Sequence, residues 1–371
     1  MPLIFVFLNL NHNLNRNPIK IMITITIIEV TMTQDPSSSF MPPLTLRGVC
    51  YDPPLFCAPM AGITHSAFRR LLADFGGYGA LFTEMLSARM IVHEDPLTSP
   101  WLKRRPQEKR VIYQLLITDA IRLPATLAKL TPSSRDGIDI NLGCPAATVQ
   151  QKGGGSNLFD DPARLCEIIR TIRRDFAGPL TVKIRLGRPT PDWRTVLHDR
   201  LRLFEDEGID AITLHPRFAE ESLNRYQPRH TCYAELATET KLPIIANGDI
   251  TGLDYFQSNE ALFSPSAGLM IGRMAAARPW IFAQWHQPDL PVDHHAVWTR
   301  LCDYMEEDFE LKKGLIRLKV FTPYFARNFV FGHTLFAAIQ SAPDWSTARA
   351  RADEFLSSNP ALNKRISLSG L

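Results

Sequence analysis

The chain has 371 residues, of which 45% are hydrophobic and 21% are charged, and its formal net charge is +3 at pH 7. This is the composition of an ordinary globular protein, and it excludes a fibrous or largely disordered class. The six cysteines show no CxxC spacing, so we expect no metal site, no disulfide framework and a cytoplasmic protein.

The first 48 residues differ from the rest of the chain. Their two apolar runs, residues 3–10 and 21–30, are both shorter than the roughly 20 residues that a membrane-spanning helix needs. No basic segment precedes the first run and no small-residue cleavage site follows it, which argues against a signal peptide. We predict that residues 1–48 are a disordered extension, or sequence upstream of a later start at Met32 or Met41, and we expect no membrane association.

From Leu55 onward, short apolar runs alternate with amphipathic stretches such as Ala163–Asp175. Their spacing is typical of repeated βα units, and eight of them over residues 49–287 predict a (β/α)₈ TIM barrel, an α/β fold. A doubly wound sheet is the alternative, but no GxGxxG follows the first run. The predicted strands are Leu55–Ala58, Ala80–Thr83, Val111–Leu116, Gly137–Ile140, Leu180–Ile184, Ala211–Leu214, Pro243–Ala246 and Gly268–Ile271.

After Trp280 the strand pattern stops. Helical periodicity takes over, and Pro288 and Pro291 mark a linker before it. We predict a small all-helical C-terminal domain over residues 288–371, with helices at Val297–Phe309, Gly314–Gln340 and Ser346–Leu356.

Polar or glycine residues stand at the end of every predicted strand. The active site of a TIM barrel lies at the C-terminal ends of its strands, and packing alone does not explain such residues at all eight ends. We therefore predict one functional site built from these positions. In chain order they are Pro59, Met60, Ala61, Gly62, Glu84, Gln114, Asn141, Cys144, Lys183, Arg185, His215, Arg217, Asn247, Gly248, Asp249, Gly272 and Arg273.

The residue types indicate a phosphorylated ligand. Glycine turns follow the last two predicted strands, where barrels commonly bind phosphate, and Arg273 adds a fork of donors. Lys183 and Gln114 would point into the barrel mouth, where a buried charge needs a partner. A flavin ring is one such partner, and an internal ion pair with Glu84 or Asp139 is the alternative.

Cys144 lies between Gly143 and Pro145 in the turn that leaves the fourth strand. A thiol at a strand end can donate a proton to a carbanion-like centre, or act as a nucleophile when it is deprotonated. The residue pattern leaves both roles open. Downstream, Lys152 is followed by three glycines and Ser156, which indicates either a close-approach loop or a plain flexible connection.

Eight stretches between Ala58 and Phe282 carry a family resemblance: APMAGITHSAFR, FTEMLSA, YQLLITD, DINLGCPAATVQQKGGGSNL, LTVKIRLG, LHPR, LPIIANGDI and LMIGRMAAARPWIF. In this order they resemble the tRNA-dihydrouridine synthase family, whose helical tail has the same position and size. NLGCP with its downstream Lys-Gly turn is the specific part, because APM and IGR also occur in other FMN barrels.

The resemblance implies an enzyme that binds FMN, takes reducing equivalents from NADPH or NADH, and saturates the C5–C6 bond of particular uridines in tRNA. Cys144 would donate a proton to C5 while the reduced flavin delivers hydride to C6. Asn141 and Lys152 would help to fix the flavin or the uracil, and Arg185 would be a more distant substrate contact. The implied flavin contacts are Pro59, Met60, Ala61, Gln114, Lys183, His215, Asn247, Gly248, Asp249, Gly272 and Arg273.

A uridine in folded RNA must be turned out of its stack to meet a flavin, so the enzyme needs a grip on the RNA backbone. Two basic stretches are candidates, residues 103–110 and residues 312–327. We take Lys312, Lys313 and Arg317 as tRNA contacts. We expect the protein to be a monomer.

Two departures from the family pattern concern substrate position more than activity. His215-Pro216-Arg217-Phe218 stands where relatives usually carry HGRT, and proline removes a backbone donor. Three glycines follow Lys152, where many relatives have a bulkier residue. The competing functions are another FMN barrel acting on a small pyrimidine, similar to dihydroorotate dehydrogenase, and a catalytically idle RNA-binding protein.

Overall fold

The computed structural model describes residues 40–223 and 225–367. The chain divides between Phe40 and Met41, and the following description concerns the part that begins at Met41. The predicted extension thus lies outside the described residues, apart from its last part. That last part, from Met41 onward, belongs to the same unit as the barrel. The antiparallel hairpin of β1 (Leu44–Leu46) and β2 (Val49–Tyr51) buries Leu44, Leu46 and Tyr51 in the core.

A closed barrel of eight parallel strands confirms the predicted fold class. The ring closes where β4 pairs with β6, and the very short β5 (Leu86–Ser87) extends the edge of β6. The strands are almost wholly buried, which is why they read as unbroken apolar runs in the sequence. Their bounds are β3 Leu55–Cys57, β4 Ala80–Phe82, β6 Val111–Leu116, β7 Ile138–Asn141, β8 Leu180–Ile184, β9 Ala211–Leu214, β10 Ile244–Asn247 and β11 Gly268–Ile271.

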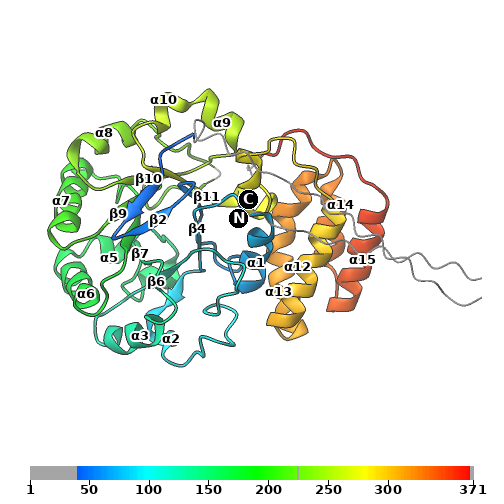
Figure 1. Ribbon diagram of the computed structural model, residues 1–371, viewed down its shortest axis with the longest axis horizontal. Helices are drawn as coiled ribbons and strands as arrows, with labels where there is room; N and C mark the ends of the chain where they lie inside the picture. Colours follow the sequence, from blue (N-terminus) through cyan, green and yellow to red (C-terminus); the bar gives the residue numbers. More distant parts are fainter. Residues whose placement is uncertain (1–39, 224, 368–371) are drawn as a thin grey trace, which may run out of the picture. The chain divides into compact units, whose positions relative to one another are not determined.

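Helices surround the strands (Figure 1). In α6 the large apolar residues Leu165, Ile168, Ile169 and Ile172 recur at helical spacing and are buried, while Asp161 caps the first turn by accepting from the Arg164 amide. The helices of the barrel are α1 Ser66–Phe75, α2 Ala88–Ile91, α3 Leu123–Leu130, α4 Ala147–Gln150, α5 Ser156–Phe159, α6 Pro162–Asp175, α7 Trp193–Asp206, α8 Cys232–Glu239, α9 Leu253–Ser258, α10 Glu260–Phe263 and α11 Arg273–Ala277.

The C-terminal segment is helical, as predicted, but the long helix predicted over Gly314–Gln340 is two helices. The break is fixed by Asn328, whose side-chain amide donates to the carbonyls of Phe325 and Ala277. Gly332 then lies so close to the Ala326 carbonyl that no side chain fits there. The elements are η1 Ala283–Trp285, α12 His294–Asp308, α13 Leu311–Phe325, η2 Ala326–Asn328, α14 Gly332–Gln340 and α15 Trp345–Ser357. We call residues 294–357 the tail.

The tail packs against the barrel on the side of α1 (Figure 1). Phe68 of α1 meets Phe321 of α13 with ring centroids 6.0 Å apart. Arg70 forms a 2.6 Å ion pair with Glu307, and Arg105 forms one of 2.5 Å with Asp308. Within the basic stretch at residues 103–110, Lys103 and Arg105 thus pair with the tail, whereas Arg104 and Arg110 pair with Asp136 of the barrel.

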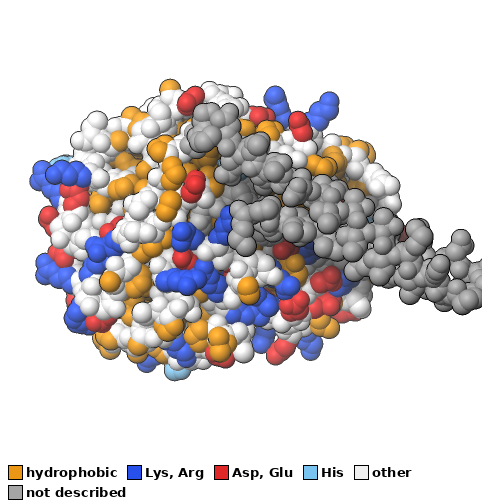
Figure 2. All heavy atoms as spheres, in the orientation of Figure 1, with side chains coloured by type: hydrophobic (Ala, Val, Ile, Leu, Met, Phe, Trp, Pro, Cys, Tyr) orange, Lys and Arg blue, Asp and Glu red, His pale blue; other side chains and the backbone are white. Residues whose placement is uncertain are grey.

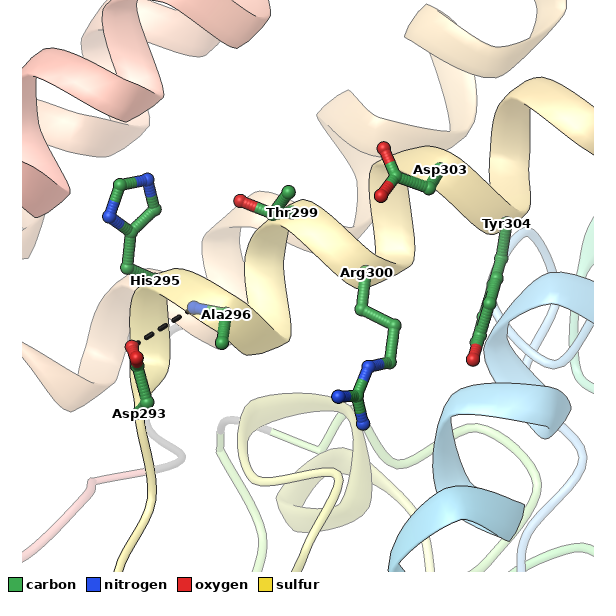
Figure 3. A pocket seen from close by; sticks show the side chains of 7 residues that line it. All are labelled: Asp293, His295, Ala296, Thr299, Arg300, Asp303 and Tyr304. Carbon is green, nitrogen blue, oxygen red and sulfur yellow. Dashed lines mark hydrogen bonds between the residues drawn. The ribbon is translucent and has the colours of Figure 1, made fainter. Parts of the chain in front are cut away.

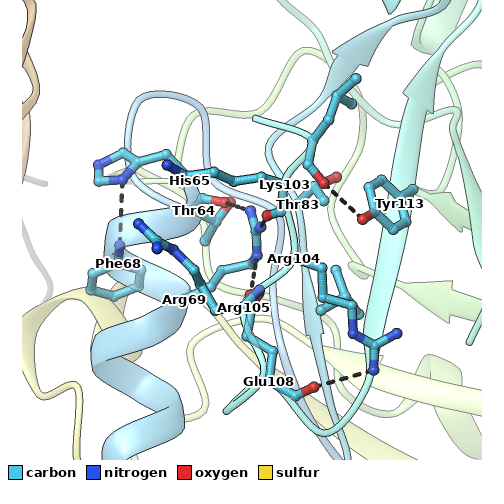
Figure 4. A network of polar contacts seen from close by, with 12 residues as sticks. Thr64, His65, Phe68, Arg69, Thr83, Lys103, Arg104, Arg105, Glu108 and Tyr113 are labelled. Carbon is cyan, nitrogen blue, oxygen red and sulfur yellow. Dashed lines mark hydrogen bonds and ion pairs between the residues drawn. The ribbon is translucent and has the colours of Figure 1, made fainter. Parts of the chain in front are cut away.

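A buried network braces the loops beneath this junction (Figure 4). Arg69 is fully buried and forms a 2.6 Å ion pair with Glu108, which is equally buried. The same guanidinium donates to the carbonyls of Thr64, at 2.9 Å, and Lys103, at 2.7 Å. Because every charge here has a partner, the network holds the loop after β3 in a fixed position.

Candidate active site

Two adjoining cavities at the C-terminal ends of the strands contain most of the predicted site residues. The first, of about 300 Å³, is lined by ten of the predicted flavin contacts: Pro59, Met60, Ala61, Lys183, His215, Asn247, Gly248, Asp249, Gly272 and Arg273. The second, of about 190 Å³, is lined by Gln114, Asn141, Cys144 and Arg185. Pro59, Ala61, Lys183 and His215 line both, so the two cavities form one cleft.

Glycines shape the wall of the first cavity. Gly248 has φ +127°, and a Cβ there would lie 2.9 Å from Cδ2 of His215. At Gly272 a Cβ would lie 3.3 Å from the Cβ of Ala58. Side chains at either position would crowd the cavity wall, so these glycines keep the backbone accessible.

Lys183, on β8, lies where the two cavities meet. Its ammonium donates to Oδ1 of Asn247 at 2.8 Å. It forms no ion pair with Glu84 or Asp139 among the described residues, so the structure does not bear out that alternative. Burial, followed by the nearby charge of Arg185, lowers the pKa of Lys183 to about 8. The amine thus stays largely protonated at neutral pH and presents its remaining donors to the cleft.

A chain of charges lies behind His215. Arg217 is fully buried, and its guanidinium lies 2.6 Å from Nε2 of His215 and 2.5 Å from Asp249. Asp249 adopts φ +52° and also forms a 2.5 Å ion pair with Arg273. A guanidinium can only donate, so Nε2 of His215 must accept and the ring proton lies on Nδ1. Burial, with the surrounding cations, lowers the pKa of His215 well below its usual value, so the ring is neutral.

Cys144 lies in the turn after β7 and lines the second cavity. Its backbone amide donates to Oδ1 of Asn141 at 3.0 Å, and its carbonyl accepts from the Ser156 amide at 3.2 Å. Gly155 has φ +59°, and a Cβ there would lie 2.6 Å from the Cys144 carbonyl oxygen. The glycine turn is therefore a close-approach loop that packs on the cysteine, which decides between the two sequence interpretations.

Two predicted site residues share hydrogen bonds inside the barrel mouth. Asn141 donates from Nδ2 to Oε1 of Gln114 at 2.8 Å. Gln114 in turn donates from Nε2 to Oδ2 of Asp139 at 2.8 Å. Both amides are thus held from within the barrel, whatever further contacts they make in the cleft.

The predicted substrate contacts are not all gathered at the cleft. Arg185 lines the second cavity but uses its guanidinium to bind the carbonyls of Phe218, Ala219 and Glu221. Lys152, Lys312 and Lys313 are exposed. Arg317 is half-buried and lies 3.5 Å from Glu84, whose carboxylate also accepts from the Gly62 amide at 2.7 Å. Arg317 therefore joins the tail to the barrel mouth.

A larger cavity, of about 550 Å³, lies elsewhere, on α12 (Figure 3). Its polar groups serve the packing of helices. Asp293 caps α12, His295 pairs with Asp353, and Tyr304 donates to Asp74. Arg300 also reaches Asp74, at 3.5 Å. With its groups engaged in this way, the groove offers no set of convergent reactive groups, and the cleft is the better candidate.

Three residues that line or support the cleft were not among the predicted flavin and substrate contacts, although Arg217 was among the strand-end residues of the predicted site. Arg217 follows His215 by two residues at a strand end, and this spacing was the only indication in the sequence that the two side chains meet. Asp139 is wholly buried one residue from the end of its predicted strand, where a carboxylate is unexpected without a role. Tyr324 reaches the first cavity from α13, and no local pattern marks it.

A parallel (β/α)₈ barrel whose strand ends bring together a thiol, a lysine, three amides and glycine turns defines a barrel enzyme. Residues 56–321 match the dihydrouridine synthase (Dus) family. The chain is 34% identical to tRNA-dihydrouridine synthase B of Proteus vulgaris over 62% of this chain and 70% of that protein. It is 32% identical to the Escherichia coli K12 protein of the same name over 68% of this chain and 79% of the relative. The chain belongs to the dihydrouridine synthase family, and it is accordingly a flavin-dependent oxidoreductase.

Solved structures agree on the fold. The old yellow enzyme homologue from Zymomonas mobilis aligns with a TM-score of 0.50 at 11% sequence identity, covering 70% of this chain and 96% of that one. Among the described residues, no helix is long and apolar enough to cross a membrane. The same residues contain no cluster of ligands suited to a metal ion.

Proposed function

We propose that this enzyme reduces the C5–C6 double bond of uridine in tRNA, with FMN as its cofactor, NADPH or NADH as the reductant and Cys144 as the proton donor. The observation that carries the proposal is the joined cleft. A thiol lines one cavity, glycine turns with an arginine line the other, and Lys183 and His215 stand between them. Membership of the dihydrouridine synthase family supports the same reaction.

The first cavity suits a phosphorylated flavin. The backbone near Gly248 and Gly272 is open to a close approach, and Arg273 supplies a fixed cation beside it. Lys183 would face the pyrimidine edge of the ring, with the neutral His215 offering its Nδ1 proton nearby. Pro59, Met60 and Ala61 would lie against the ring. The donors in this set match an anionic phosphate and the carbonyl edge of the ring.

When it is bound, FMN supplies the hydride that is added at C6 of the uracil. Cys144 supplies the proton at C5, so the base gains two hydrogens in total. The backbone contacts to Asn141 and Ser156 hold the thiol in the second cavity. A general acid of this kind typically contributes about 10² to 10⁴ in rate.

We further propose that residues 288–371 contact the tRNA. Lys312 and Lys313 are exposed at the start of α13, and they are the tail lysines best placed for phosphate. Lys319 instead donates to the Ala342 carbonyl within the tail. Figure 2 shows basic side chains spread over one face of the molecule, many beside acidic ones, so a few projecting cations matter more than a broad basic field.

The test is reduction of tRNA from a strain that lacks dihydrouridine. Purified protein with FMN and NADPH should add two hydrogens at defined uridines, detected by mass spectrometry. Cys144→Ala should lose this activity and keep its flavin spectrum. Cys166→Ala is the matched control, because that thiol is also half-buried but bonds to Glu207 on the barrel exterior. Unchanged tRNA, with turnover of dihydroorotate instead, would refute the proposal.

A further inference from the structure

A continuous hydrogen-bond path joins the backbone of Cys144 to a carboxylate buried in the barrel. The Cys144 amide donates to Asn141 at 3.0 Å, Asn141 donates to Gln114 at 2.8 Å, and Gln114 donates to Asp139 at 2.8 Å. We call these four groups the amide relay. Its last member, Asp139, is fully buried and also accepts from the Thr181 hydroxyl at 2.6 Å.

The strand register explains how these side chains meet. Gln114 lies opposite Asp139 between β6 and β7, and Asp139 lies opposite Thr181 between β7 and β8. The three residues therefore form one row across three strands. Asn141 follows Asp139 by two residues on β7, so the two side chains point to the same face.

The chemistry of the two ends fixes the direction of every bond. A backbone N–H can only donate, and an ionised carboxylate can only accept. Each amide between them has one donating and one accepting end, so only one orientation of Asn141 and Gln114 satisfies both ends. If the orientation reversed, Nδ2 of Asn141 would face the N–H of Cys144, and two donors would oppose each other.

We propose that Asp139 is a positioning residue, whose carboxylate sets the direction of the amide relay and thereby holds the Cys144 loop for proton transfer. The inference rests on the proposed function, because it concerns the acid of that reaction. Asp139 does not reach the cleft itself. It acts through Gln114 and Asn141, and the hydroxyl of Thr181 keeps its second oxygen satisfied.

The surroundings of Asp139 are consistent with this role. Burial raises its pKa to about 6, while the hydrogen bonds from Thr181 and Gln114 and the charge of Lys183 oppose the rise. Gln114 on β6 and Thr181 and Lys183 on β8 are the polar groups that face it. At neutral pH the carboxylate therefore remains an acceptor.

A double-mutant cycle separates direction from packing. In Asp139→Asn, the new side-chain oxygen can still accept from Gln114, provided that the new side-chain nitrogen donates to the Thr181 hydroxyl. The relay therefore keeps its direction in part of the molecules. Adding Thr181→Val removes that acceptor, and the Asn amide then turns its donor toward Gln114 and reverses the relay. Thr181→Val alone leaves the carboxylate in place and should cost little.

The measurement is the single-turnover rate of uridine reduction by prereduced enzyme, per mole of bound flavin. We expect about a threefold loss for Thr181→Val, about tenfold for Asp139→Asn, and several hundredfold for the pair, well beyond the product of the single losses. Losses that simply multiply would overturn the proposal and indicate packing alone. In a Cys144→Ala background, the same substitutions should have no further effect on the residual rate, and an undiminished loss there would also overturn it.

Wild-type protein in the same assay separates the two levels of inference. If the wild type does not reduce tRNA, the proposed function fails. If it does and the cycle is additive, only the role of Asp139 fails.

Discussion

The barrel mouth and the tail both carry charged and polar groups, but they hold these groups differently. At the mouth, Arg217 is bound to His215 and Asp249, and Asn141 is bound to Gln114. On the tail, Lys312 and Lys313 project from the start of α13. A group held on several sides acts at one position, as chemistry requires, whereas a projecting lysine can follow a mobile polyanion.

The largest expected effect is at the mouth. In Gly155→Ala the new Cβ would overlap the Cys144 carbonyl at a backbone φ of +59°. The acid loop must then move, and we expect about a hundredfold or greater loss in the rate of uridine reduction with flavin still bound. Gly48→Ala is the matched control, because Gly48 has φ +78° but no neighbouring atom within 4 Å of a Cβ. Equal activity losses in the two variants would mean that backbone strain, not contact with Cys144, matters.

The second prediction concerns the free energy of unfolding that is lost when the buried carboxylate of Asp139 ionises. The pKa of Asp139 is about 6 in the folded protein, above its ordinary value of 3.8, so folding is favoured while the group is protonated. That contribution is complete below about pH 4 and is lost as the pH rises through about 6. Asp139→Asn does not titrate, so its stability relative to wild type should grow by about 2 kcal/mol between pH 4 and pH 7.

Chemical denaturation at a series of pH values measures this difference. Glu354→Gln, which removes an exposed carboxylate on α15, serves as the control and should follow the wild-type profile. If the difference in free energy of unfolding between Asp139→Asn and wild type stays constant over this pH range, burial does not raise the pKa of Asp139.

A smaller effect is expected on the tail. Reversing both charges in Lys312→Glu/Lys313→Glu should weaken tRNA binding by about tenfold or more at moderate salt and flatten its salt dependence. The flavin spectrum should not change. Lys241→Glu makes one such reversal just before β10, at the opposite end of the barrel from the cleft. If that variant loses as much affinity, net charge rather than the tail governs binding.

The smallest effect is expected at the surface pair between Lys313 and Glu310. Their charged atoms lie 3.5 Å apart and both side chains are mostly exposed. Glu310→Gln should therefore shift Tm by no more than about 1 °C. A shift of several degrees would mean that the tail, like the mouth, depends on fixed charge pairs.

Sequence reasoning located the mouth because the βα repeat dictates where it lies. Strands buried on both faces read as apolar runs, and the residues that follow them reach one end of the barrel. Cys144, Lys183 and His215 were therefore assigned to one site before any contact was known. The hairpin at Leu44–Tyr51 was not predicted, because each of its two strands has only three residues. Such short segments show no alternation of apolar and polar residues that would identify a strand.

The sequence does not predict which charged residues form ion pairs with each other. Arg317 and Glu84 are 233 positions apart in the chain, and Arg105 pairs with Asp308 across the junction of barrel and tail. Both arginines belong to basic stretches that suggested RNA contact. Such pairs depend on how two elements dock, which composition and periodicity do not encode.

Because of Arg317, the tail of this protein can be replaced by that of a relative only if the new tail makes the same contacts with the barrel. Gly62, in the loop that lines the cleft, donates to Glu84, and a Cβ on it would lie 3.2 Å from both Arg317 and Val320. In a chimaera that joins this barrel to a foreign tail, the buried Glu84 would lose its ion pair with Arg317. Gly62 would lose its packing against Arg317 and Val320. A transplanted tail must therefore carry an arginine and a small apolar residue at the positions that match Arg317 and Val320 of α13, or the cleft loop loses these contacts.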